Sequence, residues 1–141
     1  MNRRTWIAAA VLLLTAACGA HGPEPIAYGA DACGYCRMQI VDPRFGAALV
    51  TAKGRTVKFD SIECLIAYYK QAAGAHDVAS VWVSDLRRPG TLIDATRARF
   101  VDLGPGKAPM GRGWAAVVDS SDAVAIGISD PGAIKRWTDL L

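Results

Sequence analysis

A stretch of alternating and clustered apolar residues predicts a β-hairpin followed by a helix. Strands are expected at 46–51 and 56–59, joined by a short polar turn. A helix is expected next, because Asp60 and Glu63 have the spacing of a capping box. Four apolar residues then recur on one helix face: Ile62, Leu65, Ile66 and Tyr69. The segment therefore predicts a strand–strand–helix unit.

Short strands and a second helix are expected in the rest of the chain. β-Prone apolar runs occur at 78–83, 91–93, 99–101, 114–118 and 123–128. A loop rich in glycine and proline at 104–109 leads to Met110. Asp130 followed by Pro131 opens a helix, because proline is well tolerated at the first helical position. Strand, strand and helix thus occur a second time.

The two halves of the chain look related. Residues 46–50 resemble residues 113–117, and Met38 and Met110 each precede the first long strand of a half. Such internal similarity indicates a duplicated unit. We therefore expect an α+β fold of two related strand–strand–helix (ββα) units with additional short strands. The expected units span residues 31–77 and 78–141.

The first residues have the pattern of an export signal. Two arginines precede an apolar run at 6–14, which is too short to cross a bilayer. Cys18 follows small residues and resembles the lipidated cysteine of bacterial lipoproteins. We expect residues 1–17 to be a signal peptide and Cys18 to carry a lipid anchor. Residues 18–30 then form a tether, and the domain is extracytoplasmic, on the periplasmic side or at the outer membrane.

Charge and cysteine content restrict the functions that the chain can have. The formal charge of +3 falls to about +1 when Arg3 and Arg4 leave with the signal, so no nucleic-acid partner is expected. Lipidation of Cys18 leaves an odd number of cysteines, which argues against a pure disulfide framework outside the cytoplasm. A free thiol with a chemical role is therefore expected.

The candidate chemistry lies in a short sulfur-rich segment. Cys33, Cys36 and Met38 offer thiolate and thioether donors, which together favour Cu(I) over harder ions. Cys36 and Met38 are two residues apart, so they project from the same face of an extended backbone and can reach one ion. Met110 can join them if the two units face each other. The sequence thus predicts a Cu(I) site.

These features together resemble the NosL family of copper-binding lipoproteins. The resemblance rests on the lipoprotein leader, the Cys33-x-x-Cys36-x-Met38 motif, the segment 59–65 with the tyrosines that follow it, and Met110. It implies an extracytoplasmic Cu(I) chaperone that supplies copper for the copper centres of nitrous oxide reductase. The implied partners are the apo reductase, its membrane transporter complex, or both.

The resemblance also implies which residues bind the ion. By position, it assigns Cys36, Met38 and Met110 to copper. Cys33 remains a further candidate because it belongs to the same sulfur-rich segment. Arg37 stands where relatives commonly have glycine.

Other functions remain open for the two neighbouring cysteines. A thiol–disulfide oxidoreductase using Cys33 and Cys36 would place them at a helix N-terminus, but no helical pattern follows Cys36. A structural zinc site would need a second Cys or His pair, which the sequence lacks. Cys64 is expected to pack against a neighbouring segment, and His21 and His76 to be surface residues. No nucleophile–base–acid set appears, so we predict that the protein is not an enzyme.

Overall fold

The computed structural model describes residues 22–71 and 77–141 of the 141-residue chain. The predictions for the signal peptide, for the anchor at Cys18, and for His21 and His76 lie outside these residues. In the part that is described, none of the helices has the length and apolar character needed to span a bilayer. All four candidate copper ligands lie within this part.

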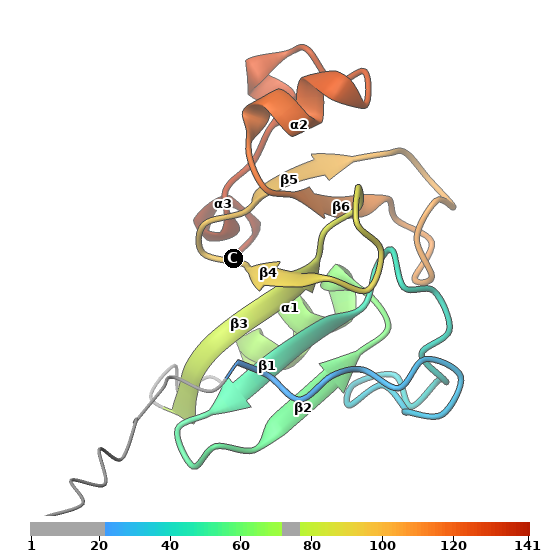
Figure 1. Ribbon diagram of the computed structural model, residues 1–141, viewed down its shortest axis with the longest axis vertical. Helices are drawn as coiled ribbons and strands as arrows, with labels where there is room; N and C mark the ends of the chain where they lie inside the picture. Colours follow the sequence, from blue (N-terminus) through green and yellow to red (C-terminus); the bar gives the residue numbers. More distant parts are fainter. Residues whose placement is uncertain (1–21, 72–76) are drawn as a thin grey trace, which may run out of the picture.

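The larger of two sheets is antiparallel and has four strands. They are β1 (Ala47–Thr51), β2 (Thr56–Phe59), β3 (Val78–Ser84) and β4 (Leu92–Asp94). Their order is β2-β1-β3-β4 (Figure 1). The predicted hairpin is confirmed, since Ala47 pairs with Phe59 and Val50 pairs with Thr56.

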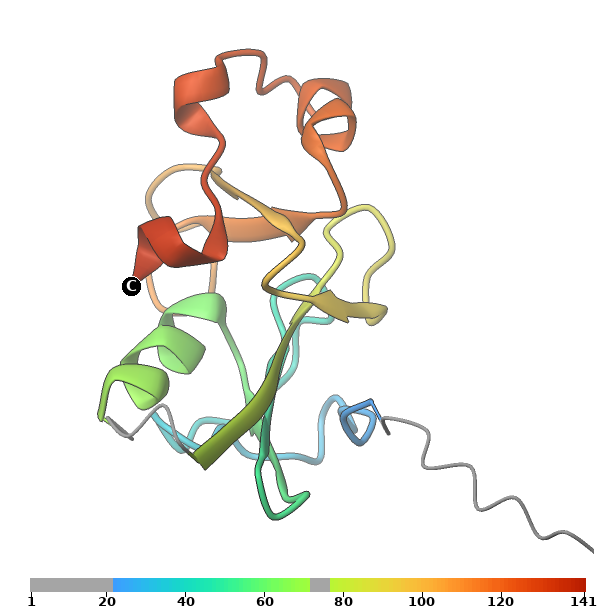
Figure 2. The ribbon, with the colours of Figure 1, turned by 90° about the vertical axis from the view of Figure 1, so that its left-hand side faces the viewer.

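Helix α1 (Ile62–Gln71) covers one face of this sheet (Figure 2). The backbone N–H of Cys64 donates to Oγ of Ser61 at 3.2 Å, so the Ser61 side chain caps the first turn. The capping box predicted for Asp60 and Glu63 is therefore wrong. This difference leaves the carboxylates of Asp60 and Glu63 for contacts with other segments.

The smaller sheet pairs β5 (Arg99–Asp102) with β6 (Trp114–Val117) in antiparallel fashion. It lies beyond the β4 edge of the larger sheet (Figure 1). Three short helical segments follow it: α2 (Ser120–Ala125), the 3-10 turn η2 (Pro131–Ala133) and α3 (Trp137–Leu140). The α+β class is confirmed.

Two details of the predicted second unit differ from the structure. Residues 123–128 do not form a strand, because the Asp119 side chain accepts hydrogen bonds from the backbone N–H groups of Ser121 and Asp122 and starts helix α2. The boundary expected after residue 77 does not separate the sheets, since β3 pairs with β1 across it. The second strand–strand–helix sequence is thus β5, β6 and α2.

The two sheets share a hydrophobic core. Phe59 and Leu65 of the larger sheet and α1 belong to the same buried cluster as Phe100 of β5. Trp137 of α3 packs edge-on against Tyr69 of α1, with ring centroids 5.5 Å apart. These contacts hold α1 against the C-terminal half of the chain and fix the position of its first turn.

Candidate metal centre

Three thiols and one carboxylate converge where the loop 31–40 meets the junction of β2 and α1. The Sγ atoms of Cys33, Cys36 and Cys64 and a carboxylate oxygen of Asp60 all lie within 4.8 Å of one another. All three cysteines are free thiols. Cys33, Cys64 and Asp60 are buried, with 1%, 0% and 3% of their surface exposed, whereas Cys36 is only partly buried. The cluster therefore has a buried interior and one member that reaches the surface.

Backbone contacts hold the loop 31–40 against β2. The N–H of Gly34 donates to the carbonyl of Lys58 at 2.7 Å. A Cβ at Gly34 would overlap with Cγ1 of Val57, so this close approach requires glycine. The N–H of Cys33 donates to the carbonyl of Met38 at 2.8 Å and closes the loop on itself. The sequence Cys33-Gly34 thus places a thiol directly beside the end of β2.

Arg37 turns the loop between Cys36 and Met38. Its φ of 69° lies in the left-handed region, and among the residues described here no other non-glycine residue has a positive φ. Its N–H donates to the carbonyl of Cys33 at 3.1 Å. The turn brings the backbone N–H of Met38 to the Cys36 thiol. Arg37 therefore adopts a conformation that suits glycine, at an energetic cost to the chain.

The junction of β2 and α1 presents the other two members of the cluster. Asp60 directly follows the buried Phe59 at the end of β2, and Cys64 lies in the first turn of α1. The cap at Ser61 begins the helix at this point. The Asp60 carboxylate and the Cys64 thiol lie on the same side of this junction, with a carboxylate oxygen and Sγ within 4.8 Å of each other.

The cluster is poorly solvated and incompletely hydrogen-bonded. The thiol of Cys36 donates to Oδ2 of Asp60 at 3.4 Å. Oδ1 of Asp60 is buried and has no hydrogen-bond partner among the described residues. A buried oxygen of this kind is costly unless a proton or a cation completes its environment. The arrangement therefore fits a site that accepts a cation.

Burial also governs the protonation of the thiols. It raises the pKa of Cys36, an effect that the backbone N–H of Met38 partly offsets. It raises the pKa of Cys64 far above the ordinary value for a thiol. Both side chains therefore hold their protons at neutral pH, and a bound metal ion must displace them.

The structure brings two of the predicted ligands together, Cys33 and Cys36. Met38, two residues beyond Cys36, is 57% exposed. The extended backbone expected between Cys36 and Met38 is wrong, because Arg37 between them has a φ of 69°. Met38 is an exposed residue of this turn and not a member of the buried cluster.

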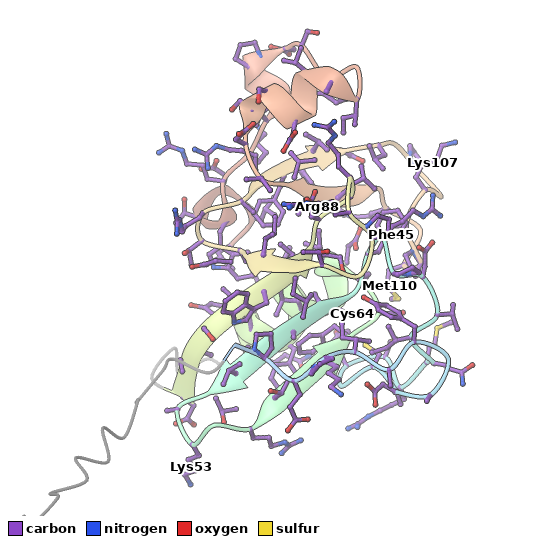
Figure 3. The ribbon with its side chains drawn as sticks, viewed as in Figure 1. Phe45, Lys53, Cys64, Arg88, Lys107 and Met110 are labelled. Atoms are coloured by element: carbon purple, nitrogen blue, oxygen red, sulfur yellow. The ribbon has the colours of Figure 1, made fainter. Side chains whose placement is uncertain are left out.

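Met110 lies in the loop between β5 and β6 and is 40% exposed. In the view of Figure 3, the labelled Met110 and Cys64 both lie in the right-hand half of the molecule. The end of its loop is tied to α1, because the backbone N–H of Trp114 donates to Oε1 of Glu63 at 3.4 Å. Glu63 directly precedes Cys64, so the Met110 loop is anchored beside the helical turn that carries the thiol.

Sequence reasoning missed Asp60 and Cys64 as members of the site. It assigned Asp60 to a helix cap and Cys64 to packing, although an acid and a thiol four residues apart at a strand–helix junction were visible. What the sequence does not show is the contact of Gly34 with Lys58, which brings the two segments together.

The donor set decides what the cluster can do chemically. Thiolates favour soft ions such as Cu(I). Three thiols with one carboxylate also match the four-ligand arrangement that tetrahedral zinc prefers. The pair Cys33 and Cys36 lies in a loop and not at a helix N-terminus, and burial raises the pKa of Cys36. Both findings disfavour the activated thiolate of an oxidoreductase.

A small α+β fold with a thiol-rich cluster that opens at one cysteine has the donor atoms to hold a metal ion. The sequence model of the NosL family matches residues 26–141, and the chain therefore belongs to the NosL family. NosL is a copper chaperone family and not an enzyme family, so the prediction that the chain is not an enzyme is confirmed.

A comparison of folds agrees with this assignment. The chain is similar to the crystal structure of the copper chaperone NosL from Shewanella denitrificans, with a TM-score of 0.66 and 23% sequence identity. The match covers 78% of this chain and 89% of that chain. No curated protein matches the chain significantly.

Proposed function

We propose that this chain is an extracytoplasmic Cu(I) chaperone that delivers copper for assembly of the copper centres of nitrous oxide reductase. Membership of the NosL family supports copper as the cargo. The observation that carries the proposal is the position of Cys36, which is the partly exposed member of an otherwise buried thiol cluster. A soft ion bound there is held by sulfur and remains accessible to an acceptor.

The proposed ligands are the Cys36 thiolate and the thioethers of Met38 and Met110, with Cys33 behind Cys36. The two thioethers are ligands at any pH, whereas the Cys36 thiol must release its proton when the ion binds. Cu(I) forms low-coordinate complexes, so an incoming donor can bind before a thioether leaves. The exposure of Met38 and Met110 supports this stepwise exchange.

The leader supports the proposed location. A signal peptide that ends at Cys18 would export the chain, and lipidation at Cys18 would hold the domain at a membrane surface. The tether 18–30 would then let the domain reach an extracytoplasmic acceptor. The proposed acceptors are the apo reductase, its membrane transporter complex, or both.

Zinc binding is a second candidate function, and the structure supplies a specific reason for it. Asp60 and Cys64 complete a four-donor set that the sequence did not reveal. A resident Zn(II) bound by Cys33, Cys36, Cys64 and Asp60 would make the cluster structural and leave the methionines without a role.

A metal titration distinguishes the two functions. The purified full-length protein, reduced and kept anaerobic in detergent, is titrated with Cu(I) and with Zn(II) against competing chelators. We expect preference for Cu(I), and at least a tenfold weaker Cu(I) affinity, about 1.4 kcal/mol, in Cys36→Ser, Met38→Ile and Met110→Ile. Val41→Ala is the matched control, because Val41 is 60% exposed near Met38 and has no sulfur.

Two results would overturn the copper proposal. One is a wild-type preference for Zn(II), and the other is unchanged Cu(I) affinity in all three variants. The choice of acceptor is tested separately by mixing the Cu(I)-loaded protein with copper-free nitrous oxide reductase. Transfer should restore the copper content of the reductase and should fail with Cys36→Ser.

A further inference from the structure

The candidate ligands of this site are more numerous than one Cu(I) ion can use. We propose that the chain holds a second, buried Cu(I) position formed by Cys33 and Cys64 with Asp60 beside them, and that Cys36 bridges it to the outer position. This inference rests on the proposed copper function. The outer position is the one formed by Cys36 with the two exposed methionines.

The donors are separated by depth. Cys33, Cys64 and Asp60 are 1%, 0% and 3% exposed, whereas Met38 and Met110 are 57% and 40% exposed. Cu(I) is low-coordinate, so one ion cannot bind both the buried thiols and the surface thioethers. An ion bound only at the surface would leave two buried thiols and a buried carboxylate without a metal-binding role.

Cys36 has the position that a bridging ligand needs. Its thiol contacts Oδ2 of Asp60 at 3.4 Å, and it interacts with both Cys33 and Cys64. All of these donor atoms lie within 4.8 Å of one another. A thiolate sulfur has several lone pairs, so Cys36 can bind an inner and an outer ion at the same time.

The buried carboxylate of Asp60 favours a cation inside the cluster. The thiols keep their protons until copper displaces them, but a buried carboxylate oxygen without a partner is costly. Among the ion pairs of the described residues, none involves Asp60, and its Oδ1 has no partner. A second Cu(I) ion near Asp60 compensates charge that a single surface ion would leave.

Loading and release then follow a fixed order. Each Cu(I) ion that binds displaces the protons of the thiols it uses, and no electron is transferred. The outer ion exchanges with an acceptor through the thioethers. The inner ion reaches the surface only through Cys36, so it leaves second.

Stoichiometry and spectroscopy test the inner position. The reduced full-length protein is titrated anaerobically with Cu(I), and bound copper and free thiols are counted. We expect about two equivalents of Cu(I) for the wild type and about one for Cys64→Ala. A short copper–copper distance should appear in the X-ray absorption of the wild type and disappear in Cys64→Ala. Asp77→Asn changes an exposed carboxylate away from the cluster and is the control, which should keep about two equivalents.

A second variant keeps the test valid if Cys64→Ala fails to fold. The double variant Met38→Ile, Met110→Ile changes only exposed side chains and should retain about one equivalent of Cu(I), shielded from chelators by burial. One equivalent in the wild type, or loss of all copper in the double methionine variant, would overturn the second position while leaving a single-ion chaperone intact. Failure to bind any Cu(I) would instead refute the proposed function itself.

Discussion

Replacement of Arg37 by glycine should stabilise the protein, because Arg37 has a φ of 69°. A residue with a Cβ pays about 1–2 kcal/mol in the left-handed region. Glycine removes that cost, but its greater conformational freedom in the unfolded chain lowers the free energy of unfolding by about 0.5–1 kcal/mol. The net gain is about 0.5–1 kcal/mol in the free energy of unfolding. Arg37 is exposed and takes part in none of the ion pairs of the described residues, so little is lost with its side chain.

Urea unfolding of the wild type, Arg37→Gly and Arg37→Ala measures this effect at constant m-value. Alanine removes the guanidinium group but keeps the Cβ, so Arg37→Ala should stay within about 0.5 kcal/mol of the wild type. If Arg37→Gly were no more stable than Arg37→Ala, the backbone strain assigned to this turn would be refuted. Cu(I) stoichiometry should be the same in all three proteins.

Three further predictions concern the packing and electrostatics of the fold. Gly34→Ala should cost about 1–3 kcal/mol of stability because its Cβ overlaps with Val57, and Val57→Ala should recover part of this loss in a double-mutant cycle followed by urea unfolding. Trp137→Ala should cost about 3–5 kcal/mol, because this side chain is buried against two aromatic rings, whereas Thr138→Ala on the exposed side should change the unfolding free energy by less than about 0.5 kcal/mol. Hydrogen bonds from a serine hydroxyl and from backbone N–H groups hold the pKa of Asp119 below its usual value. The ionised Asp119 side chain therefore stabilises the folded protein above the ordinary pKa of 3.8, and this stabilisation is lost as the pH falls through the folded-state pKa. The difference in unfolding free energy between the wild type and Asp119→Asn should accordingly vanish in acid. A difference that stays constant across the pH range would contradict this prediction.

The local elements were the part of the fold that the sequence could predict. A short apolar run, a turn at 52–55 and a second β-prone segment indicated the β1–β2 hairpin, and the apolar stripe indicated α1. The pattern failed at 123–128, where an apolar run suggested a strand. A single side chain at Asp119 decides that region, because it satisfies the first N–H groups of a helix.

The candidate site was predictable only where its residues are neighbours in sequence. Cys33, Cys36 and Met38 could be recognised by spacing. Asp60 and Cys64 could not, because their role depends on the loop 31–40 lying against the end of β2, a tertiary contact that leaves no periodic pattern in the sequence. The larger sheet had the same difficulty, since β3 pairs with β1 across a long stretch of chain.

The most direct test of the copper site is the position of the metal itself. Crystals of the reduced protein loaded with Cu(I) under anaerobic conditions would locate copper through its anomalous scattering. Copper should be bonded to Sγ of Cys36, with thioether sulfur from Met38 or Met110 among the outer ligands. Copper found away from Cys36, or bound only by nitrogen and oxygen, would contradict the proposed copper site.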